Sequence, residues 1–250
     1  MITWNPWKGC RRCSEGCRYC MCQRSVKKKG VEELVFEKSK QYGAPLDKNK
    51  NGEYKIPGGK LVSVANNSDF FLPEADKWRE GIWKIIRERK DLMFLVRTRR
   101  IERFYDCIPD DWQMGYDNVI VACAVEDQKT ADERLPIFLE LPIKHKAVLC
   151  APLLELINIE SYLDTIETVI AGGEAAKNAR PLDFEWLPDI RWQCINTNTD
   201  FIFGRCGTHF LKDGRMYNMG VKEQTDHARK INIDYYSATG EHNLTTAQYG

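Results

Sequence analysis

The residues most suited to chemistry are five cysteines near the start of the sequence: Cys10, Cys13, Cys17, Cys20 and Cys22. Cysteine thiolates are ligands of iron–sulfur clusters and of structural zinc. The two C-x-x-C pairs within this segment are separated by only three residues, whereas zinc sites have a longer connection that lets two pairs converge tetrahedrally. The spacing therefore favours an iron–sulfur cluster over zinc, and either metal centre over reduced thiols alone.

Cys13, Cys17 and Cys20 have the C-x3-C-x2-C spacing of the radical S-adenosylmethionine enzymes. Three cysteine ligands leave one iron of a [4Fe–4S] cluster open. In the enzymes that this motif resembles, the amino and carboxylate groups of S-adenosylmethionine chelate that iron, and an electron from the cluster cleaves the sulfonium. The resemblance implies a [4Fe–4S] cluster, S-adenosylmethionine and an electron donor.

The overall composition is that of an ordinary globular protein. The 250 residues carry 37 basic and 36 acidic side chains, so no global charge predicts binding to nucleic acid or a membrane. We see no signal peptide, and apolar runs such as 119–125 are too short to span a bilayer. A cytoplasmic protein without a membrane partner is expected. The five scattered cysteines include three within apolar runs, which are expected in the core.

Short β-prone runs alternate with helical patterns from residue 61 onward. The expected strands cover residues 61–65, 92–96, 119–125, 147–150, 168–171, 191–195 and 201–204, and the expected helices cover 74–89, 101–107, 128–139 and 160–163. This alternation predicts an α/β fold with a single (β/α) barrel, complete or partial and TIM-like, behind a cysteine-rich N-terminal loop.

The predicted barrel occupies residues 1–213. It includes the cluster loop at 10–22 and a polar insertion at 23–59, expected as a short helix and a surface loop or hairpin. Residues 214–250 form a C-terminal extension that either packs on the barrel or is loosely ordered.

Functional residues of such barrels gather where strands end. Ser68 and Asp69 follow one predicted strand, and Asp69 suits either a ribose or substrate contact or a helix cap. Glu126 and Asp127 follow another strand with the same two alternatives, and the position of Glu126 favours the site. Gly172, Gly173 and Glu174 follow a third strand. The glycines suit close approach of a ligand or a tight turn, and Glu174 suits a ligand amine.

A closer resemblance runs from about residue 3 to 207. It is carried by Thr3-Trp4-Asn5-Pro6, Gly9-Cys10, Gly16-Cys17, Cys20, Asn67-Ser68-Asp69-Phe70-Phe71, Val125-Glu126-Asp127-Gln128, Gly172-Gly173-Glu174 and Ala179-Arg180-Pro181. These residues resemble a phage-associated family of uncharacterised three-cysteine-motif proteins, which is similar to the radical S-adenosylmethionine superfamily. The resemblance implies Cys10, Cys17 and Cys20 as cluster ligands, and Cys13 is the cysteine that this sequence adds. Four ligands would close the open iron.

The substrate class rests on basic residues. Arg97, Arg99, Arg100 and Arg103 form a dense segment, which together with Lys27–Lys29 and Arg11–Arg12 suits phosphate groups or a solvated surface. The leading hypothesis is a radical S-adenosylmethionine-type enzyme acting on an unknown substrate, with a nucleotide or nucleic acid favoured. The alternative is a non-catalytic iron–sulfur or zinc protein that binds nucleic acid or a partner protein.

Overall fold

The computed structural model describes residues 1–20, 22, 35–238 and 243–245. The helix expected early in the polar insertion, and with it Lys27–Lys29, lies outside the described residues. The chain divides into two compact units. The first unit comprises residues 1–13, 22–122 and 141–145, and the second comprises residues 14–21, 123–140 and 146–250.

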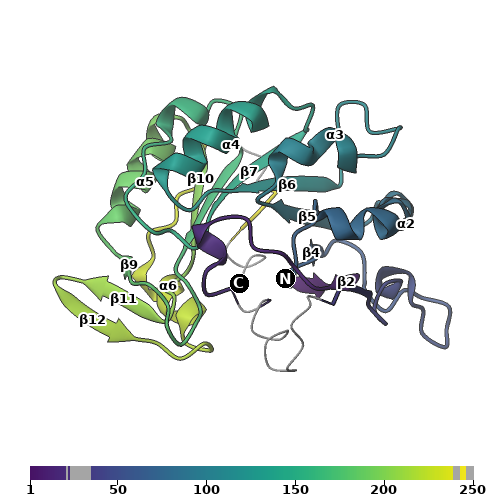
Figure 1. The fold of residues 1–250 in the computed structure, drawn as a ribbon, viewed down its shortest axis with the longest axis horizontal. Helices are drawn as coiled ribbons and strands as arrows, with labels where there is room; N and C mark the ends of the chain where they lie inside the picture. Colours follow the sequence, from purple (N-terminus) through teal and green to yellow (C-terminus); the bar gives the residue numbers. More distant parts are fainter. Residues whose placement is uncertain (21, 23–34, 239–242, 246–250) are drawn as a thin grey trace. The chain divides into compact units, whose positions relative to one another are not determined.

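In the described part of the chain, seven strands are hydrogen-bonded in the order β1-β4-β5-β6-β7-β8-β10 (Figure 1). Their bounds are β1 (Ile2–Trp4), β4 (Leu61–Val64), β5 (Met93–Thr98), β6 (Val119–Ala124), β7 (His145–Cys150), β8 (Thr168–Gly172) and β10 (Asp200–Arg205). The order rises along the chain, as in a (β/α) barrel. Helices alternate with these strands along the chain, which confirms the α/β class.

In the first unit, β1 pairs in parallel with β4, and β4 with β5. Along the chain, η3 (Pro73–Ala75) and α2 (Asp76–Glu88) lie between β4 and β5. Strand β5 is followed by η4 (Ile101–Arg103) and α3 (Phe104–Cys107). Helix α2 lies within the helix expected at 74–89 and buries Ile82, Trp83, Ile85 and Ile86. The indole of Trp83 packs edge-on against Phe70 at 5.0 Å between ring centroids.

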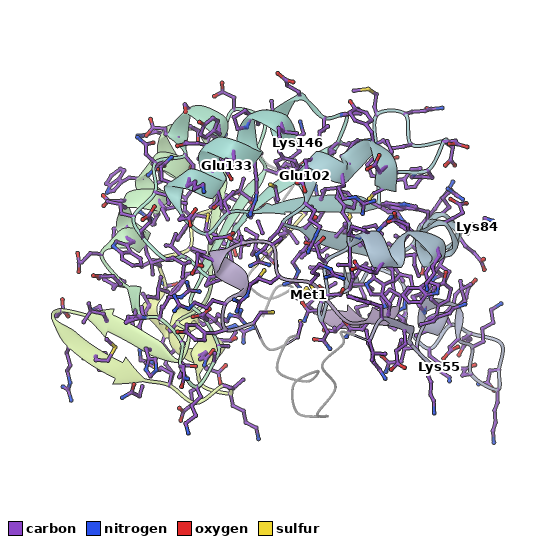
Figure 2. All side chains as sticks on the ribbon, viewed as in Figure 1. Met1, Lys55, Lys84, Glu102, Glu133 and Lys146 are labelled. Carbon is purple, nitrogen blue, oxygen red and sulfur yellow. The ribbon has the colours of Figure 1, made fainter. Side chains whose placement is uncertain are left out.

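A buried arginine anchors the described part of the polar insertion, which contains η2 (Ala44–Leu46) and carries Lys55 (Figure 2). Arg89 is 0% exposed and donates to the carbonyl oxygens of Pro45 and Ile56 and to the carboxylate of Asp91. Its guanidinium also lies over the ring of Tyr54, 4.0 Å from the centroid. The insertion is therefore fixed to the end of α2. Nearer the N-terminus, β2 (Trp7–Lys8) pairs with β3 (Glu37–Lys38).

In the second unit, β7 pairs in parallel with β8, and β8 with β10. This unit contains α4 (Gln128–Glu140), η5 (Glu160–Tyr162) and α5 (Trp186–Asn196). The strand expected at 191–195 is wrong, because these residues belong to α5. That helix buries Leu187, Ile190 and Cys194 at helical spacing, and Pro188 lies in its first turn, where proline is tolerated.

The described C-terminal residues pack on β10. The unit adds β9 (Leu182–Asp183), β11 (His209–Lys212), β12 (Arg215–Asn218) and α6 (Gln224–Ile231), and the β11–β12 hairpin lies beside α6 (Figure 1). Beyond α6, Tyr235 bridges to Phe201, and the amide of Ser237 donates to Asp200 at 2.8 Å. These contacts cover an edge strand of the sheet.

The three cysteines expected in the core are buried, and so are the other two scattered cysteines; the five are Cys107, Cys123, Cys150, Cys194 and Cys206. Burial raises the pKa of the Cys107 thiol to about 11 and that of Cys206 to about 12. The pKa of Cys150 and of Cys194 rises further for the same reason. None of the described helices has the length and apolar character needed to cross a membrane.

Candidate metal centre

Four of the clustered cysteines, Cys10, Cys13, Cys17 and Cys20, lie on irregular chain and one short helical turn. Cys10 is buried and Cys13 is exposed, and Cys17 ends η1 (Glu15–Cys17). The amide of Cys20 donates to the carbonyl of Cys17 at 3.2 Å. All ten cysteines are thiols. Among the described residues no group of three or more His, Cys, Asp or Glu side chains is arranged to hold a metal ion, so the cluster stays a prediction.

Ser68, in the first unit, lies after β4 and holds the residue that precedes Cys10. Its hydroxyl donates to the carbonyl of Gly9 at 2.6 Å and accepts a hydrogen bond from the indole of Trp7 at 3.0 Å. Trp7 is 0% exposed and packs on Phe70, so this indole is a core residue that also orients the serine. Ser68 thereby fixes the main chain on one side of Cys10.

Asp69 is buried, and protein donors surround its carboxylate. Oδ1 accepts from the amide of Phe71 and the hydroxyl of Thr98, while Oδ2 accepts from the amide of Arg99 and from Nη1 of Arg100, at 2.8 to 2.9 Å. A carboxylate has about four acceptor positions, so these donors use its capacity. Asp69 therefore organises the loop around it instead of capping α2.

Arg100 links Asp69 to the cysteine segment, because its guanidinium contacts both. Its Nη2 donates to the carbonyl of Arg11 at 2.5 Å, on the other side of Cys10. Burial disfavours the charged guanidinium, but the negative charges of Asp69 and of Cys13 and Cys10 in their thiolate forms outweigh it and raise the pKa of Arg100.

Glu126 and Asp127, in the second unit, have different roles although they are neighbours. Asp127 caps α4, because its Oδ1 accepts the amide of Thr130 at 2.8 Å. Glu126 is 0% exposed, and its Oε1 accepts the amide of Gly16 at 3.2 Å. The other oxygen, Oε2, pairs with Arg134 of α4 at 2.9 Å.

Glu174 acts on the same turn through an arginine. The Oε1 atom of Glu174 lies 2.8 Å from Nη2 of Arg180, and its Oε2 accepts the amide of that arginine at 2.9 Å. Nη2 of Arg180 also donates to the carbonyl of Glu15 at 3.0 Å. The guanidinium lies 5.4 Å from the ring centroid of Tyr19.

The two glycines before Glu174 meet the end of β10. The amide of Gly173 donates to the carbonyl of Arg205 at 3.0 Å. A Cβ atom at Gly173 would lie 2.3 Å from the carbonyl oxygen of Cys206, which no side chain tolerates. A Cβ at Gly172 would lie 3.3 Å from the side chain of Arg205. The close approach of two main chains therefore explains why position 173 needs glycine. At Gly172 a side chain would make a tight contact with Arg205.

The strand-end residues share one property. Ser68 and Glu126 hydrogen-bond to the main chain of the cysteine segment directly, and Asp69 and Glu174 do so through an arginine. The sequence named Arg100 only as a candidate phosphate contact and Arg180 only as part of a family motif, and it did not connect either with the cysteine segment. Arg134 was missed, and its only signal is a lone arginine within a helical pattern.

Arginines of the basic segment at 97–103 make ion pairs and hydrogen bonds within the first unit. Arg103 pairs with Asp76 at 2.8 Å and donates to the carbonyl of Phe71, and Arg97 donates to the hydroxyl of Ser63. Nη2 of Arg100 donates to the carbonyl of Arg11, so these three arginines have structural contacts. Their contribution to phosphate binding stays a prediction.

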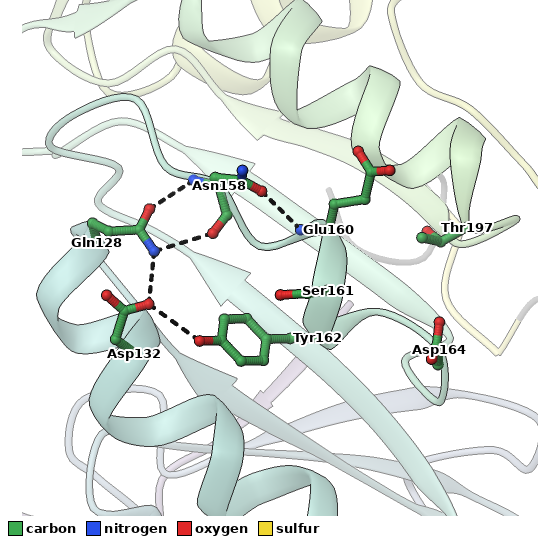
Figure 3. A pocket seen from close by; sticks show the side chains of 8 residues that line it. All are labelled: Gln128, Asp132, Asn158, Glu160, Ser161, Tyr162, Asp164 and Thr197. Carbon is green, nitrogen blue, oxygen red and sulfur yellow. Dashed lines mark hydrogen bonds between the residues drawn. The ribbon is translucent and has the colours of Figure 1, made fainter.

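A polar pocket of about 680 Å³ opens elsewhere in the second unit, between α4, the loop after β7 and the end of α5 (Figure 3). Hydrogen bonds from Gln128 to Asn158 and Asp132, and from Tyr162 to Asp132, brace this loop on α4. Its lining includes three carboxylates and none of the predicted site residues. The negative charge makes it unsuited to phosphate groups.

The fold and the candidate site define an α/β protein with a parallel sheet in chain order, whose strand-end residues hold a segment with clustered cysteines. Residues 1–237 match the family described as "Protein of unknown function (DUF5131)". The chain belongs to this family. No curated protein and no solved structure matches the chain.

Proposed function

We propose that the protein is a radical S-adenosylmethionine-type enzyme on a partial (β/α) barrel. One [4Fe–4S] cluster is held by Cys10, Cys17 and Cys20, with Cys13 as the alternative third ligand. The cluster, when bound, supplies the electron that cleaves S-adenosylmethionine. A nucleotide or nucleic acid is the favoured substrate class, and a cytoplasmic location with a cellular electron donor belongs to the same proposal.

The observation that carries this proposal is the set of contacts to the main chain beside the cysteines. Ser68 and Arg100 hold the carbonyls of Gly9 and Arg11, which flank Cys10. Glu126 holds the amide of Gly16, the residue before Cys17. A metal site needs ligands whose positions are fixed by a surrounding shell of hydrogen bonds, and buried Arg100 and Glu126 and half-buried Ser68 supply such hydrogen bonds here.

The donor chemistry fits an iron–sulfur cluster. The cysteines are thiols, Cys10 and Cys17 are buried, and the charge of Arg100 lies near Cys10 and Cys13. Soft thiolate ligands suit iron–sulfur clusters. The proposal gives Asp69 and Glu174 the task of orienting this segment, since arginines and main-chain amides already engage both carboxylates.

Anaerobic reconstitution with iron and sulfide tests the proposal. We expect about four irons per chain and formation of 5′-deoxyadenosine from S-adenosylmethionine after reduction with dithionite. The variant with Cys17→Ala and Cys20→Ala is the control and should show neither. One tightly bound zinc without iron would overturn the proposal.

The position of Cys13 supports a second candidate, a non-catalytic iron–sulfur protein that binds nucleic acid or a partner protein. Cys13 lies near the same guanidinium as Cys10, and four cysteine ligands would leave no open iron. Four irons per chain without cleavage of S-adenosylmethionine would favour this candidate.

A further inference from the structure

The carboxylate of Glu126 is buried without any contact to solvent. Its partner Arg134 is 8% exposed and also donates to the carbonyl of Ala124 at 2.6 Å. Burying an ion pair is costly, and a well-packed apolar pair of the same volume is often at least as stable. Core stability alone therefore does not explain why these two residues are charged.

The second oxygen of Glu126 shows what the charge does. It accepts the amide of Gly16 in the first turn of η1, and amides in a first helical turn have no partner within the helix. A charged acceptor makes such a hydrogen bond worth about 1.5–3 kcal/mol. Gly16 directly precedes Cys17, so this hydrogen bond fixes the main chain that presents the thiol.

The identity of Gly16 agrees with this contact. A Cβ atom at this position would lie 3.0 Å from both Cδ and Oε1 of Glu126, tighter than an ordinary van der Waals contact. The carboxylate and the turn are therefore fitted to each other, and a side chain at position 16 would displace one of them.

We propose that Glu126, oriented by Arg134, is a positioning residue that holds the Cys17 turn and sets the electrostatic environment of the bound cluster. The inference rests on the proposed function for the identity of the metal centre. The reduction potential of an iron–sulfur cluster depends on nearby charges and hydrogen bonds. Removing the negative charge of Glu126 should therefore raise the potential, and removing the positive charge of Arg134 should lower it.

Hydrogen exchange of the full-length, metal-free protein tests the positioning part. In Glu126→Ala, peptides that cover residues 14–20 should exchange at least about tenfold faster than in the wild type. Glu133→Gln is the matched control, because Glu133 stands beside Arg134 on the same helix with a 58% exposed side chain. It should exchange as the wild type does. Equal protection in Glu126→Ala and the wild type would overturn the inference.

Redox titration of the reconstituted protein, followed by electron paramagnetic resonance, tests the electrostatic part. Glu126→Gln keeps an acceptor for the Gly16 amide, so it should retain its iron and show a higher midpoint potential. Arg134→Gln should show a lower one, and Glu133→Gln no change. A role in folding alone would not produce opposite shifts, so equal potentials in all four proteins would overturn the inference. A wild-type protein that binds no iron would instead overturn the proposed function, and this role with it.

Discussion

The carboxylate of Asp69 and the guanidinium of Arg100 meet at 2.9 Å in an ion pair from which water is largely excluded. Asp69 follows β4 and Arg100 follows β5, so the pair joins the ends of two neighbouring parallel strands. Nη2 of Arg100 donates to the carbonyl of Arg11. The pair therefore fixes Arg11, the residue that follows Cys10, relative to the ends of β4 and β5.

Asp69→Asn should lower the free energy of unfolding by about 3–5 kcal/mol, because it leaves the buried guanidinium of Arg100 without its charged partner. Urea denaturation measures this change. Asp117→Asn is the control: Asp117 pairs with Lys144, but their side chains are 85% and 50% exposed, so the loss should stay below about 1 kcal/mol. Equal losses in the two variants would contradict the role given to Asp69.

Gly173→Ala should destabilise the protein by about 1–3 kcal/mol, since the new methyl group forces apart the main chains that directly follow β8 and β10. Thermal and urea denaturation measure the loss. Gly43→Ala provides the comparison, because a Cβ atom there meets nothing within 4 Å and the change should stay within about 0.5 kcal/mol. A neutral Gly173→Ala would show that the glycine serves something other than close approach.

The fold could be predicted where local pattern and burial agree. The apolar run at 119–125 is β6, and the apolar stripe of residues 74–89 marks α2. Prediction failed at α5, because Trp192 and Ile195 favour strands locally while the burial of Leu187, Ile190 and Cys194 follows helical spacing. Strand β1 was missed because three residues give no readable period.

The sequence predicted which strand-end residues form the candidate site, but not which residues they contact. Strand ends identified Ser68, Asp69, Glu126 and Glu174, since parallel strands place their carboxyl ends together. The sequence could not distinguish ligand contact from support of the cysteine segment. That distinction depends on which donors reach each carboxylate, and the partners lie far along the chain: Gly16 and Glu126 are 110 residues apart.

Cys107→Ala should reduce the decrease in the free energy of unfolding that occurs as the pH rises above 9. Burial raises the pKa of this thiol from about 9 to about 11, so the folded protein keeps a proton that the unfolded chain has lost. The stabilisation is complete below pH 9 and disappears as the pH rises through 11. Between these values the wild type should lose about 2–3 kcal/mol more than Cys107→Ala. Denaturation at several pH values measures the difference, and identical slopes would contradict it.

Cys10→Ala should abolish cluster binding, whereas Cys13→Ala should retain about four irons per chain. Under the proposed function the third ligand must be held in place, and the main chain is fixed on both sides of Cys10 by Ser68 and Arg100. Cys10 is also 9% exposed, while Cys13 is exposed. Iron analysis and electron paramagnetic resonance after anaerobic reconstitution measure the result. Loss of iron only in Cys13→Ala would transfer the ligand role to Cys13. Loss in both variants would indicate four cysteine ligands and a closed cluster, which would favour the non-catalytic candidate over the enzyme.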